Sequence, residues 1–387
     1  MPLNYLHLQN QISQLAAAAV SRQTELAARL EECRTLLHEQ AHNLKGLQQK
    51  VEETAAKEKN LRCAVPVSEP LTAHIPAPAT TLPCTVLSAD GSQITPNPHE
   101  AIYYGVVNVG IFRMQPGSGL APTTETSTQL IYAADDADEN ELVTEELINL
   151  QRDVNERQKL AELARTIPAP LVTLTDGPLE LYHEPRENHL YKQYFEAYLD
   201  ALNELALRDV ITAGYVDRPR AALLVALLEL VREPAAEAGP HPFAGLSDLA
   251  LMRALLQPGE RSAVFALQFR ASQEFSGRKA LHFFYLNVGS SERPAIARVE
   301  VPLWVVENPA SLALLHAVLL DQSRQSGAHP YPYALLRAHE TAVVKLDENE
   351  ALKLLIQKEL LSRGLPLQAD SEKLANKKVG ARTRYAL

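Results

Sequence analysis

The clearest limit on the fold of this chain is the order of strand-like and helix-like segments between residues 84 and 217. Three segments rich in β-branched and aromatic residues come first, and such residues favour strands. A helical segment, an apolar strand, a second helical segment and a further strand follow them. In chain order the seven segments are residues 84–90, 101–114, 126–135, 140–165, 171–176, 188–208 and 209–217. Three meander strands followed by alternating helices and strands predict an α/β protein with a mixed sheet.

The second half of the chain predicts additions to this core. Further strands are expected at 263–270, 281–288 and 296–306. A helix should open at Asn308-Pro309, because proline is favoured in the first turn, and another should run from Asp347 to about Arg363. We therefore predict a ribonuclease H-like mixed-sheet core with additional strands and C-terminal helices.

The N-terminal segment predicts a long helix that precedes this core. Residues 5–60 contain no proline and a single glycine, Gly46, among many good helix formers. The residues with the spacing of a heptad seam are Leu26, Leu30, Cys33, Leu37, Gln40, Leu44, Leu47 and Val51, after an earlier seam of Leu8, Ile12, Leu15 and Ala19. A narrow seam indicates a coiled-coil arm for dimerisation or docking. A long helix packed on its own domain is the alternative.

These patterns predict four regions. Residues 1–63 form the helical arm, and 64–83, with five prolines, form an extended linker. Residues 84–365 form the folded domain, and 366–387 form a basic tail.

Composition excludes several classes of protein. The formal charge of 37 − 47 = −10 argues against coating nucleic acid through the overall field, although a local groove for DNA stays possible. No apolar run approaches the roughly 18 residues of a membrane span, and no secretory signal opens the chain, so a cytoplasmic protein is expected. The three cysteines lack C-x-x-C spacing, and the motifs of P-loop ATPases, Rossmann dehydrogenases, zincins and α/β-hydrolases are missing.

Two aspartates follow apolar strands in the same way, in Asp90-Gly91-Ser92 and Asp176-Gly177-Pro178. An aspartate at the carboxyl end of a strand, with glycine to release the chain, exposes its carboxylate in a crevice. If the two strands are neighbours, the carboxylates face each other and can share a hard divalent cation. The alternative is that each Asp-Gly pair only makes a turn.

A third carboxylate is expected from the helix between these strands. Glu156 shares a half-apolar face with Leu160 and Leu163, where a carboxylate needs a partner or an ion. An ion pair with Arg152, four residues earlier, explains Glu156 equally well. Glu145 is the second candidate for the helical ligand.

Near the C-terminus, a proline turn precedes a short helix that carries a histidine. Tyr331 lies before this helix and His339 within it. A packed or exposed histidine and a core tyrosine are the ordinary alternatives to an active-site pair.

Together these motifs resemble the NurA family of DNA repair nucleases, from about residue 84 to residue 345. The resemblance rests on Asp90-Gly91-Ser92, the R-x-x-x-E helix of Arg152 and Glu156, LVTLTDGPL at 171–179, AGYVDRPR at 213–220, and Y-P-x-x-L-x-x-A-H from Tyr331 to His339. The chain departs from the family pattern at Asp217, where a small polar or basic residue is expected, and at Ala334, which replaces a frequent proline.

The resemblance implies a ribonuclease H-like homodimer that uses Mn²⁺ or Mg²⁺. It implies 5′-to-3′ exonuclease and single-strand endonuclease activity on DNA, with a HerA-type hexameric DNA-translocating ATPase, in double-strand-break end resection. By position, Asp90 and Asp176 match the metal-binding aspartates, Glu156 matches the helical acid, and Tyr331 and His339 match the C-terminal active-site pair. His339 would ligate a metal or move a proton.

Two other functions stay open from the sequence. A non-catalytic coiled-coil adaptor would keep the fold while its metal site had decayed. A metal-dependent phosphoesterase would instead act on nucleotides or RNA.

Overall fold

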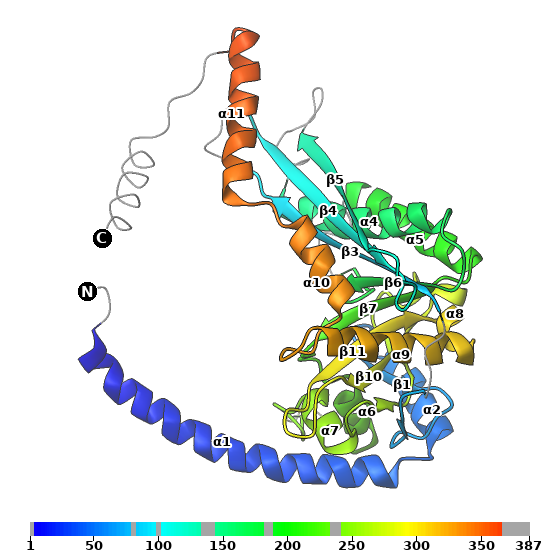
Figure 1. Cartoon of the computed structure of the whole chain (residues 1–387). Coiled ribbons are helices and arrows are strands. Elements are labelled where there is room, and N and C mark those ends of the chain that lie inside the picture. Colours follow the sequence, from blue (N-terminus) through cyan, green and yellow to red (C-terminus); the bar gives the residue numbers. More distant parts are fainter. Residues whose placement is uncertain are drawn as a thin grey trace. The chain divides into compact units, whose positions relative to one another are not determined.

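The computed structural model describes residues 4–78, 83–97, 102–132, 144–181, 189–232 and 241–365 (Figure 1). The chain divides into two compact units. Unit 1 comprises Met1–Cys84, Val172–Glu180 and Leu205–Tyr333, and unit 2 comprises Thr85–Leu171, Leu181–Glu204 and Ala334–Leu387. Each unit is described by itself.

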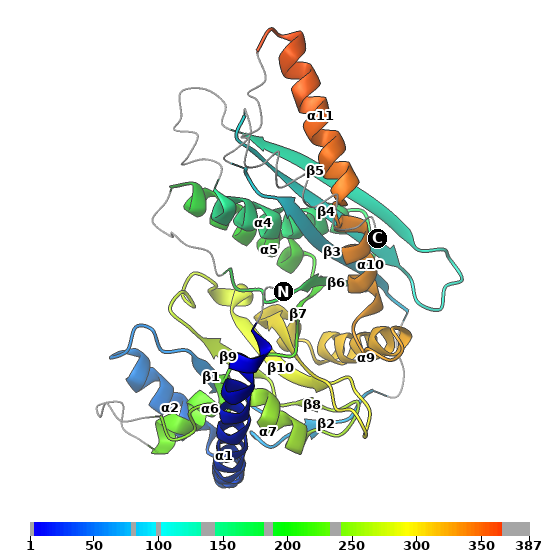
Figure 2. The same ribbon diagram turned by 90° about the vertical axis from the view of Figure 1, so that its left-hand side faces the viewer.

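Unit 2 is built on an antiparallel meander of β3 (Thr85–Ile94), β4 (Tyr104–Met114) and β5 (Thr123–Tyr132). The first nine residues of β4 are buried, as expected for a strand covered on both faces. Helices α4 (Glu145–Ala164) and α5 (His189–Leu207) lie side by side near these strands in both ribbon views (Figures 1 and 2). Two further helices, α10 (Tyr333–Ala342) and α11 (Leu346–Ser362), complete the described part of the unit.

Unit 1 contains the parallel pair of the mixed sheet, β6 (Leu171–Asp176) and β7 (Ile211–Asp217). Outward from β7, antiparallel strands follow in the order β11, β10, β9 and β1. Their bounds are β11 (Ile296–Pro302), β10 (Leu281–Asn287), β9 (Phe265–Gln268) and β1 (Cys63–Pro66). The short strand β8 (Arg261–Ser262) pairs with β10, and β2 (His74–Ile75) pairs with β8. Every residue of β10 and β11 is buried, so these strands form the centre of the core.

Helices surround the sheet of unit 1. In chain order they are α1 (Tyr5–Glu39), α2 (Leu44–Ala55), α6 (Leu223–Arg232), α7 (Asp248–Leu255), α8 (Leu303–Val306) and α9 (Pro309–Gln325), with a 3₁₀ turn at Gly277–Lys279. Asn308 caps α9 by accepting hydrogen bonds from two backbone N–H groups of the first turn, as its place before Pro309 suggested. The sequence reading did not predict α6 and α7.

The predicted fold class is confirmed. The three meander strands, then α4, β6, α5 and β7, follow in the expected ribonuclease H-like order. The sheet is mixed, because β6 and β7 are parallel whereas the meander strands are antiparallel, and a long helix opens the chain. Among the described helices, none is long and apolar enough to cross a bilayer.

The region expected to be a linker contributes strands to unit 1. Residues Cys63–Pro66 form β1, which pairs with β9, and His74–Ile75 form β2. An apolar stretch between prolines can pair at the edge of a sheet, where the missing N–H of proline costs no ladder bond. The prediction of an extended linker is therefore wrong for residues 64–66 and 74–75. The basic tail lies outside the described residues.

The predicted N-terminal helix is interrupted at residues 40–43, where α1 ends and α2 begins. From Cys33 onward the seam is covered by its own unit: α1 contacts α6 and α7, and α2 packs on β1 and α6. Cys33 is completely buried, and burial raises the pKa of its thiol to about 12, as expected of a small hydrophobe. The earlier seam is different, since Ile12 and Leu15 are exposed. The packed-helix alternative thus describes the second half of the seam.

Candidate active site

Asp90 lies within β3 and not at its end, which corrects the expectation from the sequence. It pairs with Gly110 of β4, and the strand continues to Ile94. Gly91 does not release the chain. It keeps strand pairing with Val109, and a Cβ at this position would lie 2.4 Å from Arg152 Cγ and 2.7 Å from Glu156 Oε1. Glycine is therefore needed here because α4 approaches the strand closely.

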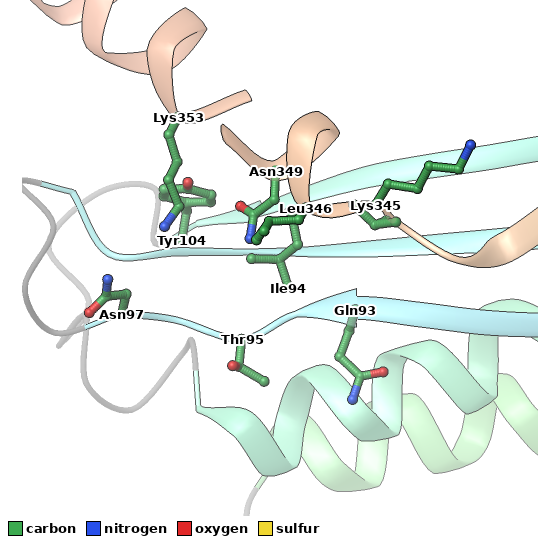
Figure 3. A pocket seen from close by; sticks show the side chains of 10 residues that line it. Gln93, Ile94, Thr95, Asn97, Tyr104, Lys345, Leu346, Asn349 and Lys353 are labelled. Carbon is green, nitrogen blue, oxygen red and sulfur yellow. The ribbon is translucent and has the colours of Figure 1, made fainter. Parts of the chain in front are cut away.

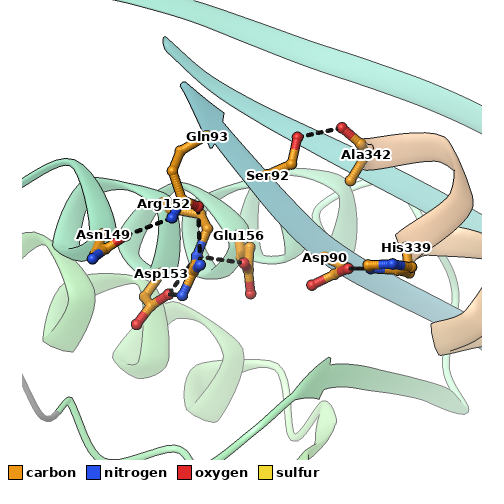
Figure 4. A network of polar contacts seen from close by, with 9 residues as sticks. All are labelled: Asp90, Ser92, Gln93, Asn149, Arg152, Asp153, Glu156, His339 and Ala342. Atoms are coloured by element: carbon orange, nitrogen blue, oxygen red, sulfur yellow. Dashed lines mark hydrogen bonds and ion pairs between the residues drawn. The ribbon is translucent and has the colours of Figure 1, made fainter. Parts of the chain in front are cut away.

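His339 contacts Asp90 directly. Its Nδ1 lies 2.6 Å from Asp90 Oδ2, and because a carboxylate only accepts, Nδ1–H is the donor (Figure 4). The side chain of His339 is 62% exposed, whereas that of Asp90 is 15% exposed. One nitrogen of the imidazole is therefore held by the carboxylate while the ring stays open to solvent.

Helix α10, which carries His339, is fixed on the meander by polar contacts and by one glycine. Ser88 Oγ donates to Ala334 O over 2.6 Å, and Ser92 Oγ donates to Ala342 O over 2.5 Å. A Cβ at Gly110 would lie 2.3 Å from Ala342 N, so only glycine allows the helix to dock so closely. The sequence reading missed Ser88 and Gly110 and named Ser92 only as part of the Asp90-Gly91-Ser92 motif; the small residues in β3 and β4 were the available signal.

Glu156 is buried beside this strand, with 6% of its surface exposed. Burial raises the pKa of its carboxyl well above the usual value, and the negative charges of Asp153 and Asp90 raise it further, while Arg152 and Arg157 act in the opposite direction. The carboxyl therefore lacks enough positive charge around it to ionise easily.

Arg152 makes only a long ion-pair contact with Glu156 and no hydrogen bond to it. The nearest nitrogen, Nε, is 3.8 Å from Glu156 Oε1, whereas the guanidinium donates to Asp153 Oδ1 at 2.8 and 3.0 Å and to Gln93 Oε1 at 3.0 Å (Figure 4). Gln93 in turn donates to Asn149 Oδ1 over 2.7 Å. The ion pair that the spacing suggested is thus the weaker contact of this arginine, and Asp153 and Gln93 are network members that the sequence reading missed.

Glu145 lies far from this cluster along α4. It is exposed in the first turn of the helix, after the cap formed by Thr144. Eleven residues separate it from Glu156, which corresponds to about 16 Å along a helix axis. Its position is therefore that of a solvated acid in the first turn, where a negative charge is favourable.

The donor set of Asp90 and Glu156 suits a hard divalent cation. Carboxylate oxygens are preferred by Mg²⁺ and Mn²⁺, and a cation would oppose the effect that burial, and then the charges of Asp153 and Asp90, have on the pKa of Glu156. Within the described ranges, no group of three or more His, Cys, Asp and Glu residues is placed to hold an ion. An ion held by two carboxylates would take its other ligands from water and substrate phosphate, as Mg²⁺ commonly does.

Asp176 and Tyr331 belong to unit 1, whereas Asp90, Glu156 and His339 belong to unit 2. Asp176 ends β6 exposed, and Gly177, with φ of +84°, turns the chain there, as the sequence suggested. The ring of Tyr331 stands edge-on to Tyr215 at 5.5 Å. Burial raises the pKa of Tyr215, and Asp217 and Asp176 add to the effect. Asp176 and Tyr331 therefore share Tyr215 as a neighbour.

A polar cavity of about 390 Å³ lies at the end of β3 beyond Gln93 (Figure 3). Ile94, Tyr104, Asn349 and Lys353 are among its lining residues. Lys353 and Asn349 come from α11, so this cavity marks the side of α11 that faces β3 and β4.

Comparison with known proteins shows a family and a fold. The family model described as "NurA domain" matches residues 84–344. The NurA nuclease from Sulfolobus solfataricus superposes with a TM-score of 0.50 at 12% identity, covering 84% of this chain and 95% of that one. Human ENDOV gives a TM-score of 0.30 at 13% identity over 67% of this chain and 82% of that one. Endonuclease V from Ciona intestinalis gives a TM-score of 0.32 at 11% identity, covering 79% of this chain and 99% of that one. No curated protein matches the sequence significantly.

Proposed function

The chain belongs to the NurA family, and we propose that it is a divalent-metal-dependent deoxyribonuclease. The observation that carries the proposal is the burial of Glu156 near Asp90, with a raised pKa and with only a long ion-pair contact of 3.8 Å to Arg152, whose hydrogen bonds go to Asp153 and Gln93. A carboxylate with a purely structural role is normally paired when buried. For a carboxylate that binds a cation, the compensating positive charge is the ion itself and is present only when the ion is bound.

In this mechanism Asp90 and Glu156 would hold the cation, Mn²⁺ or Mg²⁺. Such an ion lowers the pKa of an attacking water and stabilises the leaving oxygen of a phosphodiester. Asp90 also orients His339 through Nδ1, which leaves Nε2 to exchange a proton with water or the leaving group. Asp176 and Tyr331 keep the roles implied by the family pattern, a metal ligand and a residue that orients a phosphate oxygen or water.

Family membership supports the finer parts of the proposal. The substrate is DNA, degraded from 5′ ends and cut within single strands, in the end resection of double-strand breaks. The enzyme acts as a homodimer with a HerA-type hexameric ATPase. Two sites related by a twofold axis suit the two strands of a duplex delivered by a ring-shaped motor.

Cleavage assays on defined substrates test this function. Purified protein is incubated with end-labelled single- and double-stranded DNA, with Mn²⁺, with Mg²⁺ or with EDTA, and with RNA of the same sequence as control. We expect metal-dependent cleavage of DNA, with products that report the polarity. Binding without cleavage under all metal conditions would support the adaptor, and preferential cleavage of RNA or nucleotides would support the other phosphoesterase.

A further inference from the structure

The turn that follows Asp176 is held by a buried carboxylate that the proposed mechanism does not use. Glu300, on β11, accepts a hydrogen bond from Leu179 N through Oε2 over 2.9 Å. Its side chain is completely buried, and its other oxygen, Oε1, forms an ion pair of 2.9 Å with Arg298, which is 6% exposed. One buried carboxylate therefore joins an arginine to the backbone three residues after Asp176, and all four residues belong to unit 1.

The register of the sheet explains how Glu300 comes to this turn. Thr175 of β6, Gly214 of β7 and Glu300 of β11 are paired in one row across the three strands. A Cβ at Gly214 would lie 2.6 Å from Gly177 O and 3.2 Å from Leu179 Cγ. Glycine in the middle strand therefore leaves the space in which the turn lies against the sheet, next to the side chain of Glu300.

Glu300 lies on the face of the sheet opposite to Asp176. Side chains alternate between the two faces along a strand, and residues paired across strands share a face. Asp176 is paired with Tyr215, whereas the preceding residues Thr175 and Gly214 share the row of Glu300. Glu300 is therefore not placed to share a cation with Asp176, and it acts on that carboxylate through the backbone of the turn.

Stability alone gives little reason for a charged pair at this place. Every residue of β11 is buried, and apolar residues of similar size often replace a buried ion pair with no loss of stability. An apolar residue could not accept the N–H of Leu179, so the contribution particular to Glu300 is the fixed turn. Partners that orient a metal ligand typically contribute about 10- to 100-fold to metal affinity or activity.

We propose that Glu300 is a positioning residue for Asp176. By accepting the N–H of Leu179, with Arg298 as its counter-charge, it fixes the direction in which the end of β6 presents the aspartate carboxylate. The proposal rests on the proposed function, in which Asp176 is a metal ligand. A ligand that is held in place before the ion arrives binds it more tightly than a mobile one.

Two double variants separate the hydrogen bond from the charge pair. R298M/E300M makes both positions apolar, and R298M/E300Q differs from it only in keeping a carbonyl oxygen for Leu179 N. Because a buried amide is costlier than a buried thioether, R298M/E300Q should be no more stable than R298M/E300M in denaturant unfolding. Metal affinity should follow the opposite order, which a purely structural role would not produce.

A second arginine–glutamate pair of unit 1 supplies the matched control. Arg261 donates two hydrogen bonds to Glu69, which also accepts from a backbone N–H, that of Val264. E69M/R261M therefore removes the same kind of contact without touching the turn after Asp176.

Hydrogen exchange of the metal-free protein, followed by mass spectrometry, measures the turn directly. The amide of Leu179 should exchange at least about 10-fold faster in R298M/E300M than in the wild type. In R298M/E300Q and in E69M/R261M it should exchange at nearly the wild-type rate. This readout depends on neither the ion nor cleavage.

Binding of Mn²⁺ without DNA, measured from the electron paramagnetic resonance of the free ion, tests the link to Asp176. The apparent Kd should rise by about 10- to 100-fold in R298M/E300M and change little in R298M/E300Q and E69M/R261M. Added to Asp176→Asn, R298M/E300M should weaken binding no further, because two changes that act through one ligand are not additive.

Wild-type exchange at Leu179 in R298M/E300M would overturn the proposal. Faster exchange with wild-type affinity for Mn²⁺ would do the same, as would an equal loss of affinity with and without Asp176→Asn. A wild-type protein that binds no Mn²⁺ and cleaves no DNA is a distinct result, which would refute the proposed function and the positioning role with it.

Discussion

Glu156 carries an ionisable carboxyl at a place where ionisation is costly unless a cation is bound. Burial first, then Asp153 and Asp90, raises its pKa in the folded protein. A carboxyl with a folded pKa above its unfolded value contributes stability that is complete below the unfolded pKa. That contribution is lost as the pH rises through the folded pKa. The metal-free protein should therefore lose stability as the pH rises above the ordinary range of a glutamate.

We expect Glu156→Gln to remove this dependence, because the amide never ionises. Between about pH 5 and pH 8, the Tm of the metal-free wild type should fall relative to that of the variant. Added Mn²⁺ should raise the Tm of the wild type and leave the variant little changed. Thermal unfolding followed by circular dichroism measures both effects, with Glu162→Gln on the same helix as the control. Identical pH profiles for wild type and Glu156→Gln would contradict this account.

The two aspartates are tested separately. Asp90→Asn and Asp176→Asn should each reduce DNA cleavage by more than about 100-fold, since loss of an outer partner of a metal ligand alone costs 10- to 100-fold. Both variants should remain folded by near-ultraviolet circular dichroism. Asp200→Asn, an exposed change on α5, should cut normally. Appreciable cleavage by Asp176→Asn would remove this residue from the site while leaving Asp90 and Glu156 in place.

Helix α10 depends on an unusually close approach to β4 at Gly110. A methyl group there would meet the backbone of α10, at Ala342 N and Ala338 O, and a backbone cannot move aside as a side chain can. Overpacking of this kind typically costs about 1–3 kcal/mol. Separation of α10 from the strand would also lengthen the contact between His339 and Asp90.

Gly110→Ala should therefore lower both the free energy of unfolding, by about 1–3 kcal/mol, and the rate of cleavage. Denaturant unfolding and steady-state kinetics give the two values. Thr126→Ala, at the exposed position paired with Gly110 on β5, serves as the control and should change neither strongly. Wild-type stability and activity in Gly110→Ala would show that α10 does not need this close approach.

The two halves of the N-terminal helical segment should respond differently to truncation. Removal of residues 1–20 takes away exposed side chains such as Ile12 and Leu15, so the free energy of unfolding should stay the same. Removal of residues 1–60 also takes away the buried side chains of Cys33, Leu37, Leu47 and Val51. Burial of a large apolar side chain contributes about 1.5–3 kcal/mol, so the longer truncation should unfold unit 1. Guanidinium titration with limited proteolysis measures the difference; equal stability of both truncations would contradict it.

At the level of the complete chain, a net charge of −10 opposes the approach of DNA. Divalent cations should offset this repulsion at Asp90 and Glu156 and bridge to a phosphate. With a phosphorothioate oligonucleotide that resists cleavage, fluorescence anisotropy should show binding at least about 10-fold tighter with Mn²⁺ than with EDTA, a difference of about 1.4 kcal/mol. Glu156→Gln should lose most of the gain. Equal affinity with Mn²⁺ and with EDTA would mean that binding does not use the ion.

Periodicity and composition predicted most of the elements, because each depends on side chains close together in the chain. The strand LVTLTD at 171–176 is β6, and the helix after Asn308 begins at Pro309. The boundaries of β3 could not be predicted in the same way. Gly91 looked like the end of a strand, but pairing with β4 carries β3 through it to Ile94.

The amino-acid order was enough to indicate the α/β element sequence, the family pattern and the acids and histidine worth testing, since these reside in local spacing and residue chemistry. The tertiary structure decided which of these side chains come into contact. Asp90 and His339 are 249 positions apart and come within 2.6 Å, and Arg152 turns from Glu156 to Asp153 and Gln93. Contacts of this kind depend on register, close packing at Gly91 and Gly110, and the burial of charge, none of which is encoded in any short stretch of residues.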